Sequence, residues 1–70
     1  MKILIVDDEP NIRTLMHRYL QLDSIDSDCA ENGLSAQRML KEELYDACLV
    51  DLRMPGMDGL SLIEWIRSEG

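Results

Sequence analysis

Three carboxylates stand where two short apolar runs of the sequence stop. Asp7 and Asp8 follow the run Lys2–Val6, and Asp51 follows the run Ala47–Val50. If the two runs are neighbouring parallel strands, their carboxyl ends meet at one edge of a sheet and the three acids converge there. Carboxylates in a small volume repel one another, so a hard cation is the expected reason to keep them together. Oxygen ligands with room for water suit Mg2+ better than zinc, which prefers histidine and cysteine.

Each acid also has a simpler interpretation. Taken alone, Asp51 is a carboxylate at the end of a strand, solvated by water. The acids at positions 7–9 precede a predicted helix, where negative charge interacts favourably with the helix dipole. That interpretation explains one or two acids at the amino end of a helix, but it does not explain the third acid at Asp51.

The segment after Asp51 predicts a loop and then a helix. Pro55, Gly56 and Gly59 break the chain into turns, and Asp58 is placed to cap the next helix. The helical pattern runs through the apolar residues Leu62, Ile63 and Ile66. Trp65 on the same helix is expected to be partly buried.

The segment from Pro10 to Leu22 predicts the first helix, because apolar residues recur at the spacing of one helical face. These residues are Ile12, Leu15, Met16, Tyr19 and Leu20. His17 falls outside this stripe and is expected to be a solvated surface residue. Asp23 and Ser24 end the helix.

A second strand at Asp26–Ala30 is rich in polar residues, which an edge strand tolerates. Asn32 and Gly33 then open a second helix, whose predicted buried face consists of Ala36, Met39, Leu40 and Leu44. Alternation of strands with helices predicts an α/β fold with a parallel sheet and right-handed crossovers.

Composition limits the possible functions. Seventy residues with 46% hydrophobic content form at most one small globular domain, and a net charge of −7 argues against binding of nucleic acid or an anionic membrane. Five apolar residues before Asp7 are too few for a signal-peptide core or a membrane span. Cys29 and Cys48 lack metal-binding spacing and are interpreted as reduced, packed thiols of a cytoplasmic protein, with a disulfide as the alternative.

The sequence resembles the receiver domain of two-component response regulators. The resemblance is carried by Val6-Asp-Asp-Glu9 after the first strand and by Asp51-Leu-Arg-Met-Pro-Gly-Met-Asp-Gly59 after the third. Ala30-Glu-Asn-Gly33 and Tyr45-Asp46 also stand at matching places. The resemblance spans residues 1–70 and implies a flavodoxin-like (CheY-like) fold with strand order 2-1-3. The first helix is expected on one face of the sheet and the other two on the opposite face.

The chemistry that the resemblance implies is phosphoryl transfer from a sensor histidine kinase. Asp51 is expected to accept the phosphoryl group, so the chain acts as a phosphoacceptor and not as an enzyme. Asp8, Asp51 and the backbone carbonyl of Arg53 are expected to hold Mg2+, with Asp7 acting through water. The metal offsets the charge of the carboxylates and of the transferring oxygens.

The sequence also departs from the family. A receiver has five βα units, and this sequence matches the first three. The residues that contact the phosphoryl oxygens, a serine or threonine after the fourth strand and a lysine after the fifth, have no counterpart here, since Lys2 and Lys41 lie at the wrong ends of their elements. Ser27 stands where the family has an apolar residue. Phosphorylation and signalling are therefore expected to be impaired.

The sequence is also compatible with two alternative functions. One is a non-catalytic interaction fragment that docks a kinase through its first helix. The other is a Mg2+-dependent phosphohydrolase with an aspartyl nucleophile. Enzymes of the haloacid dehalogenase type place two aspartates separated by one residue after the first strand, whereas Asp7 and Asp8 are adjacent here and the lone Asp51 follows the third strand. The apolar third strand would lie at a sheet edge, so a homodimer is expected, through that edge or by exchange of the third helix.

Overall fold

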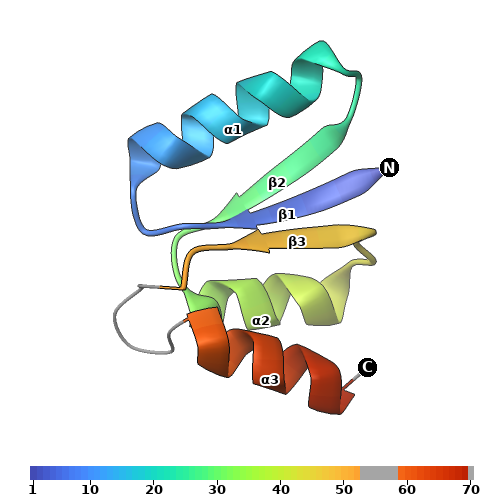
Figure 1. Cartoon of the computed structure of the whole chain (residues 1–70). Coiled ribbons are helices and arrows are strands. Elements are labelled where there is room, and N and C mark those ends of the chain that lie inside the picture. Colours follow the sequence, from blue (N-terminus) through green and yellow to red (C-terminus); the bar gives the residue numbers. More distant parts are fainter. Residues whose placement is uncertain (53–58, 70) are drawn as a thin grey trace.

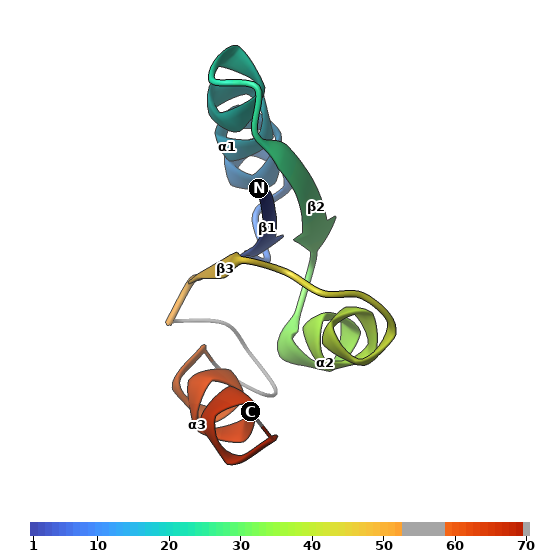
Figure 2. The same ribbon diagram turned by 90° about the vertical axis from the view of Figure 1, so that its right-hand side faces the viewer.

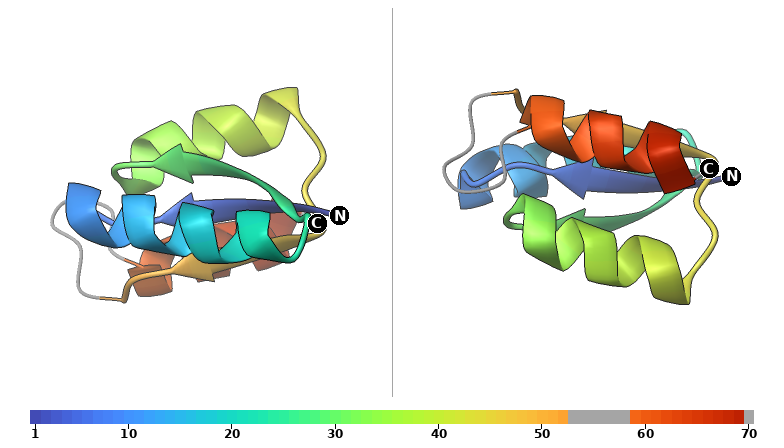
Figure 3. Two further views of the ribbon diagram at one scale, coloured as in Figure 1. Left: turned by 90° about the horizontal axis from the view of Figure 1, so that it is seen from above. Right: turned by 90° about the horizontal axis from the view of Figure 1, so that it is seen from below.

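The computed structural model describes residues 1–52 and 59–69 of the chain. It is a three-stranded parallel sheet in the order β2-β1-β3, with helices on both faces (Figure 1). The elements are β1 (Lys2–Val6), α1 (Pro10–Leu22), β2 (Asp26–Ala30), α2 (Gly33–Glu42), β3 (Ala47–Val50) and α3 (Gly59–Glu69). α1 covers one face, and α2 and α3 lie side by side on the other (Figures 2 and 3). The predicted fold class, strand order and helix placement are confirmed.

The core is built on β1, which is hydrogen-bonded to a strand on each side. Leu4, Ile5 and Val6 are fully buried, because α1 packs over one face of this strand and α2 and α3 cover the other. The main apolar cluster lies beneath the sheet and consists of Leu4, Val6, Ala30, Ala36 and Leu62. Trp65 is half-buried and packs against this cluster, as predicted.

β3 is less buried than its apolar sequence predicted. None of the residues Ala47–Val50 is buried, and Leu49 is 38% exposed. Among residues 1–52 and 59–69, no strand pairs with the outer edge of β3. An apolar run of this kind is typical of a strand buried on both faces, but β3 lies at the sheet edge, as predicted, and its side chains stay partly open to solvent.

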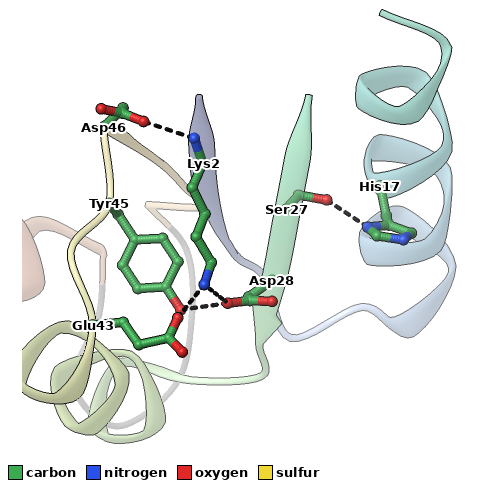
Figure 4. A network of polar contacts seen from close by, with 7 residues as sticks. All are labelled: Lys2, His17, Ser27, Asp28, Glu43, Tyr45 and Asp46. Carbon is green, nitrogen blue, oxygen red and sulfur yellow. Dashed lines mark hydrogen bonds and ion pairs between the residues drawn. The ribbon is translucent and has the colours of Figure 1, made fainter. Parts of the chain in front are cut away.

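α1 is rotated so that part of its apolar stripe remains open. Ile12, Leu15 and Tyr19 are 40%, 50% and 63% exposed. The flank that faces β2 carries His17, which is half-buried and hydrogen-bonded through Nδ1 to the hydroxyl of Ser27 (Figure 4). The prediction of a solvated histidine was wrong, and the polar residue at position 27 has a polar partner on the helix above it.

Helix ends follow local chemistry. Asn32 caps α2 by accepting a hydrogen bond from the Ser35 amide at 2.8 Å, as its position predicted. Leu44 is 95% exposed and lies beyond the last residue of α2, so its predicted burial was wrong. The predicted cap at Asp58 lies outside the described residues.

A polar network joins the amino end of β1 to the middle of β2 and to the segment that precedes β3 (Figure 4). The Lys2 amide donates to Asp46 Oδ2 at 2.7 Å, the Lys2 ammonium pairs with Glu43 and Asp28, and the Tyr45 hydroxyl donates to Asp28 at 2.6 Å. The hydrogen bond from Tyr45 lowers the pKa of Asp28. Burial and the same bond raise the pKa of Tyr45. A lowered carboxyl pKa stabilises the fold above the unfolded-state value of about 4, and this contribution is lost as the pH falls.

Both cysteines are free. Cys48 is half-buried, and burial raises the pKa of its thiol to about 11. Cys29 is exposed rather than packed, because its side chain stands on the outermost strand beside α1. In the described part of the chain, no helix has the length and apolar character that crossing a membrane requires.

Candidate metal centre

The register of β1 and β3 brings the predicted acids together. Val6 is paired with Val50, and the Asp51 amide donates to the Val6 carbonyl at 2.9 Å. The residues that follow these partners are the acids themselves. Asp7, Asp8 and Asp51 each offer a carboxylate oxygen, and these oxygens lie within 4.8 Å of one another.

Hydrogen bonds to β2, to α1 and within the turn itself hold the turn between β1 and α1. The Asp7 amide donates to the Ala30 carbonyl at 3.1 Å, and Asp7 Oδ1 accepts from the Glu9 amide at 2.9 Å. The Asp7 carbonyl accepts from the Arg13 guanidinium at 2.6 Å. Asp7 is therefore half-buried and fixed by β2 and α1, whereas Asp8 projects into solvent.

Gly59, the first residue of α3, fits tightly against the backbone of Asp51. A Cβ atom at Gly59 would lie 2.3 Å from the Asp51 carbonyl oxygen and 2.6 Å from the Leu52 Cα. Both of these neighbours are backbone atoms that cannot rotate away. Only glycine lets the start of α3 approach so closely, so this residue sets the distance between α3 and the acid at the end of β3.

An apolar groove of about 550 Å3 leads to the acids. Its walls include Ile5 and Leu49 from the sheet and Ile12 and Met16 from α1. Asp7, Glu9 and Asp51 line the same groove, at the end where the strands stop. The site is thus a carboxylate cluster beside an open apolar surface.

The donor set fits a hard divalent cation. All three clustered groups are carboxylates, two are half-buried and Asp8 is exposed, which leaves room for water ligands. Mg2+ keeps several waters and binds proteins through a few carboxylate oxygens, so these residues suit it. The fourth predicted ligand, the carbonyl of Arg53, lies outside the described residues.

Residues 3–70 match the family model of the response regulator receiver domain. The chain belongs to that family. It is 46% identical over 68 residues to the transcriptional regulatory protein ResD of Bacillus subtilis, and 42% identical over 66 residues to the response regulator PilR of Pseudomonas aeruginosa. These alignments cover 97% and 94% of this chain, but 28% and 15% of those proteins.

Solved structures of receiver proteins share the fold. The response regulator TrrA of Thermotoga maritima, in complex with Mg2+-BeF, superposes with a TM-score of 0.94 at 43% identity. That match covers 97% of this chain and 59% of TrrA. TrrA in complex with the histidine kinase ThkA also gives a TM-score of 0.94, at 42% identity, covering 99% of this chain and 60% of that chain.

Two features of the site were not predicted from the sequence. The hydrogen bond from Arg13 to the Asp7 carbonyl depends on how α1 is rotated over the sheet, which periodicity alone does not determine. The tight contact at Gly59 could have been suspected from the sequence. Glycine is a poor helix former, so a glycine inside a helical pattern often marks a close approach of backbone. The sequence identified this glycine only as a turn residue.

Replacing Gly59 with alanine tests the contact at the start of α3. We expect Gly59→Ala to lower the free energy of unfolding by about 1–3 kcal/mol, because backbone must move to admit the Cβ atom. Leu60→Ala, at a 58% exposed neighbouring position, is the control and should cost less than about 1 kcal/mol. Urea denaturation measures both, and equal stabilities would contradict the contact.

Proposed function

We propose that the chain is a phosphoacceptor module in which Asp51 receives a phosphoryl group from a phosphorylated histidine of a sensor kinase. The observation that carries this proposal is the cluster of Asp7, Asp8 and Asp51 in a member of the receiver family. An Asp51 carboxylate oxygen would form a bond to phosphorus while the N–P bond of the donor breaks. The electron pair stays on the imidazole nitrogen, and an acyl phosphate results.

Asp7, Asp8 and Asp51 would hold Mg2+, with Asp7 acting through water and the carbonyl of Arg53 as a further ligand. When bound, Mg2+ supplies positive charge that offsets the anionic carboxylates and phosphoryl oxygens. The TrrA structure with Mg2+-BeF supports this assignment by similarity.

The residues of the chain itself fix the position of Asp51 relative to Asp7 and to the start of α3. Pairing of β1 with β3 holds Asp51 beside Asp7, and the Arg13 guanidinium fixes the main chain at Asp7. The closeness of Gly59 to the Asp51 backbone keeps the start of α3 next to the reacting carboxylate. Such fixed geometry is the main contribution a protein makes to phosphoryl transfer.

The proposal includes a sensor histidine kinase as partner and a cytoplasmic location, with no enzymatic turnover by the chain itself. The complex of TrrA with ThkA supports the choice of partner. A non-catalytic fragment that docks a kinase is the second candidate, supported by the open apolar side of α1. A phosphohydrolase of this type is disfavoured because it would need two aspartates separated by one residue after β1, whereas Asp7 and Asp8 are adjacent and Asp51 follows β3.

We further propose that the chain forms a homodimer through β3. Leu49 and Leu52 are 38% and 57% exposed. One apolar groove, of about 550 Å3, lies between this strand and α1, and another, of about 490 Å3, lies between this strand and α3. A twofold axis would pair β3 antiparallel with its copy and extend the sheet to the order 2-1-3-3-1-2. Backbone groups at the edge then gain partners, which is the usual remedy for an exposed edge. Exchange of α3 between subunits is the second arrangement.

Mg2+ should bind weakly at the acid cluster. Titration should shift the backbone NMR signals of Asp8 and Asp51 and alter the fluorescence of Trp65. Asp51→Asn removes a charged ligand and should weaken binding roughly tenfold or more. Asp23→Asn, an exposed acid at the far end of α1, is the control and should have little effect. An unchanged titration with Asp51→Asn would disprove the site.

Asp51 of the 70-residue chain should be phosphorylated slowly. The two lysines offer no cation to the site, since Lys2 is bound at the amino end of β1 and Lys41 lies over the Trp65 ring. Loss of one transition-state donor typically costs roughly 100-fold in rate. Labelling with acetyl phosphate and Mg2+ measures this rate against a complete receiver, with Asp51→Asn as the unlabelled control. Rapid stoichiometric labelling would contradict the slow rate, and no labelling at all would favour the docking fragment.

Light scattering should report a dimer at micromolar concentration. Leu49→Arg places a charge beside the proposed strand pair and should shift the mass to that of a monomer. Leu34→Arg, at a 62% exposed position on α2, makes the same chemical change elsewhere and should leave the dimer intact. A folded monomer for the unmodified chain would rule out the dimer.

A further inference from the structure

α1 differs in charge from the rest of the chain. The helix has 13 residues, carries Arg13, His17 and Arg18, and contains no acidic residue. The whole chain has 14 acidic residues against 7 lysines and arginines. A basic surface on a protein of net charge −7 creates a local potential that favours an anionic partner at that place only.

These basic side chains line a groove of about 320 Å3 between α1 and β2. α1 contributes Arg13, Thr14, His17, Arg18 and Gln21, and β2 contributes Cys29. None of the described residues that line this groove is acidic. The groove is also distinct from the carboxylate cluster, which lies at the end of β1 and β3.

Two of the side chains that line this basic groove, Arg13 and His17, are held by hydrogen bonds within the chain. Arg13 is half-buried and held by its hydrogen bond of 2.6 Å to the Asp7 carbonyl. A guanidinium has five N–H donors, so this bond leaves the group able to donate further. The imidazole of His17 is held against Ser27 (Figure 4). Side chains that are already ordered lose less entropy on binding.

An open strand edge runs beside the groove. β2 is the outermost strand of the sheet, with β1 on its inner side (Figure 2). Within residues 1–52 and 59–69, no strand pairs with the outer edge of β2. An extended peptide can add to such an edge through main-chain hydrogen bonds, and alternate side chains then point to one face. On the α1 face they would meet the basic groove.

We propose that the basic groove and the outer edge of β2 form a docking site for an extended acidic peptide segment of a partner protein. Acidic side chains at alternate positions would pair with Arg18 and Arg13, while the peptide main chain follows β2. A groove of this size admits individual side chains, and the net charge of −7 repels the extended polyanionic surfaces of nucleic acids and membranes. This inference does not depend on phosphoryl transfer at Asp51.

A fluorescein-labelled peptide of sequence Thr-Glu-Thr-Glu-Thr-Glu tests the proposal, because its glutamates share one face when it is extended. Fluorescence anisotropy at low salt should report binding, which weakens as salt is added. NMR shifts should map to Arg18, Gln21 and Cys29. A peptide with lysine in place of glutamate should leave the NMR signals of Arg18, Gln21 and Cys29 unshifted, and the same shift map from both peptides would overturn the proposal.

Two charge reversals give a matched comparison. Arg18→Glu should weaken peptide binding about tenfold or more, through loss of a charge-assisted hydrogen bond. Arg38→Glu changes the net charge equally at an exposed position on α2, so it should have a much smaller effect. Equal weakening by both variants would overturn the proposal. Inorganic phosphate giving the same NMR shift map at equal concentration would assign a small-anion site instead and would also overturn it.

Discussion

Pairing of β1 along both of its edges is the interaction on which the rest of the structure depends. This strand is the most buried element, and its hydrogen bonds to β2 and β3 fix the register of the whole sheet. A shift of β3 by one residue would turn Cys48 and Val50 away from the lower core and would also separate Asp51 from Asp7. Apolar packing of the sheet therefore holds acids together that would otherwise repel one another.

The two ends of this sheet differ in how their acidic side chains are arranged. At the amino end, Lys2 satisfies nearby acids with a cation from the same chain, so the network is complete as it stands. At the carboxyl end, three carboxylates gather within 4.8 Å of one another, and the Arg13 guanidinium beside them donates to the Asp7 carbonyl. The first arrangement stabilises the fold, and the second brings together oxygen donors of the kind that Mg2+ prefers.

The sequence was sufficient for the elements, their order and the convergence of the acids, because these follow from local periodicity and from the geometry of parallel strands. It failed where the outcome depends on how layers sit on one another. The rotation of α1 decides that His17 faces β2 and that Ile12 stays open, and no pattern within one helix contains that information. The exposure of β3 has a related cause. How far the side chains of an edge strand are buried depends on the elements packed around it and not on its own apolar residues.

The distance along the chain between the paired ends of β1 and β3 has a consequence for how the protein folds. The contact between Lys2 and Asp46 closes a loop of 44 residues, whereas β1, α1 and β2 are consecutive. Contacts that are local in sequence form first, because closing a long loop costs more chain entropy. During synthesis, β1, α1 and β2 can assemble before β3 has left the ribosome. The acids at the end of β1 would then meet Asp51 only in the last step, when the surrounding core is already present to hold them.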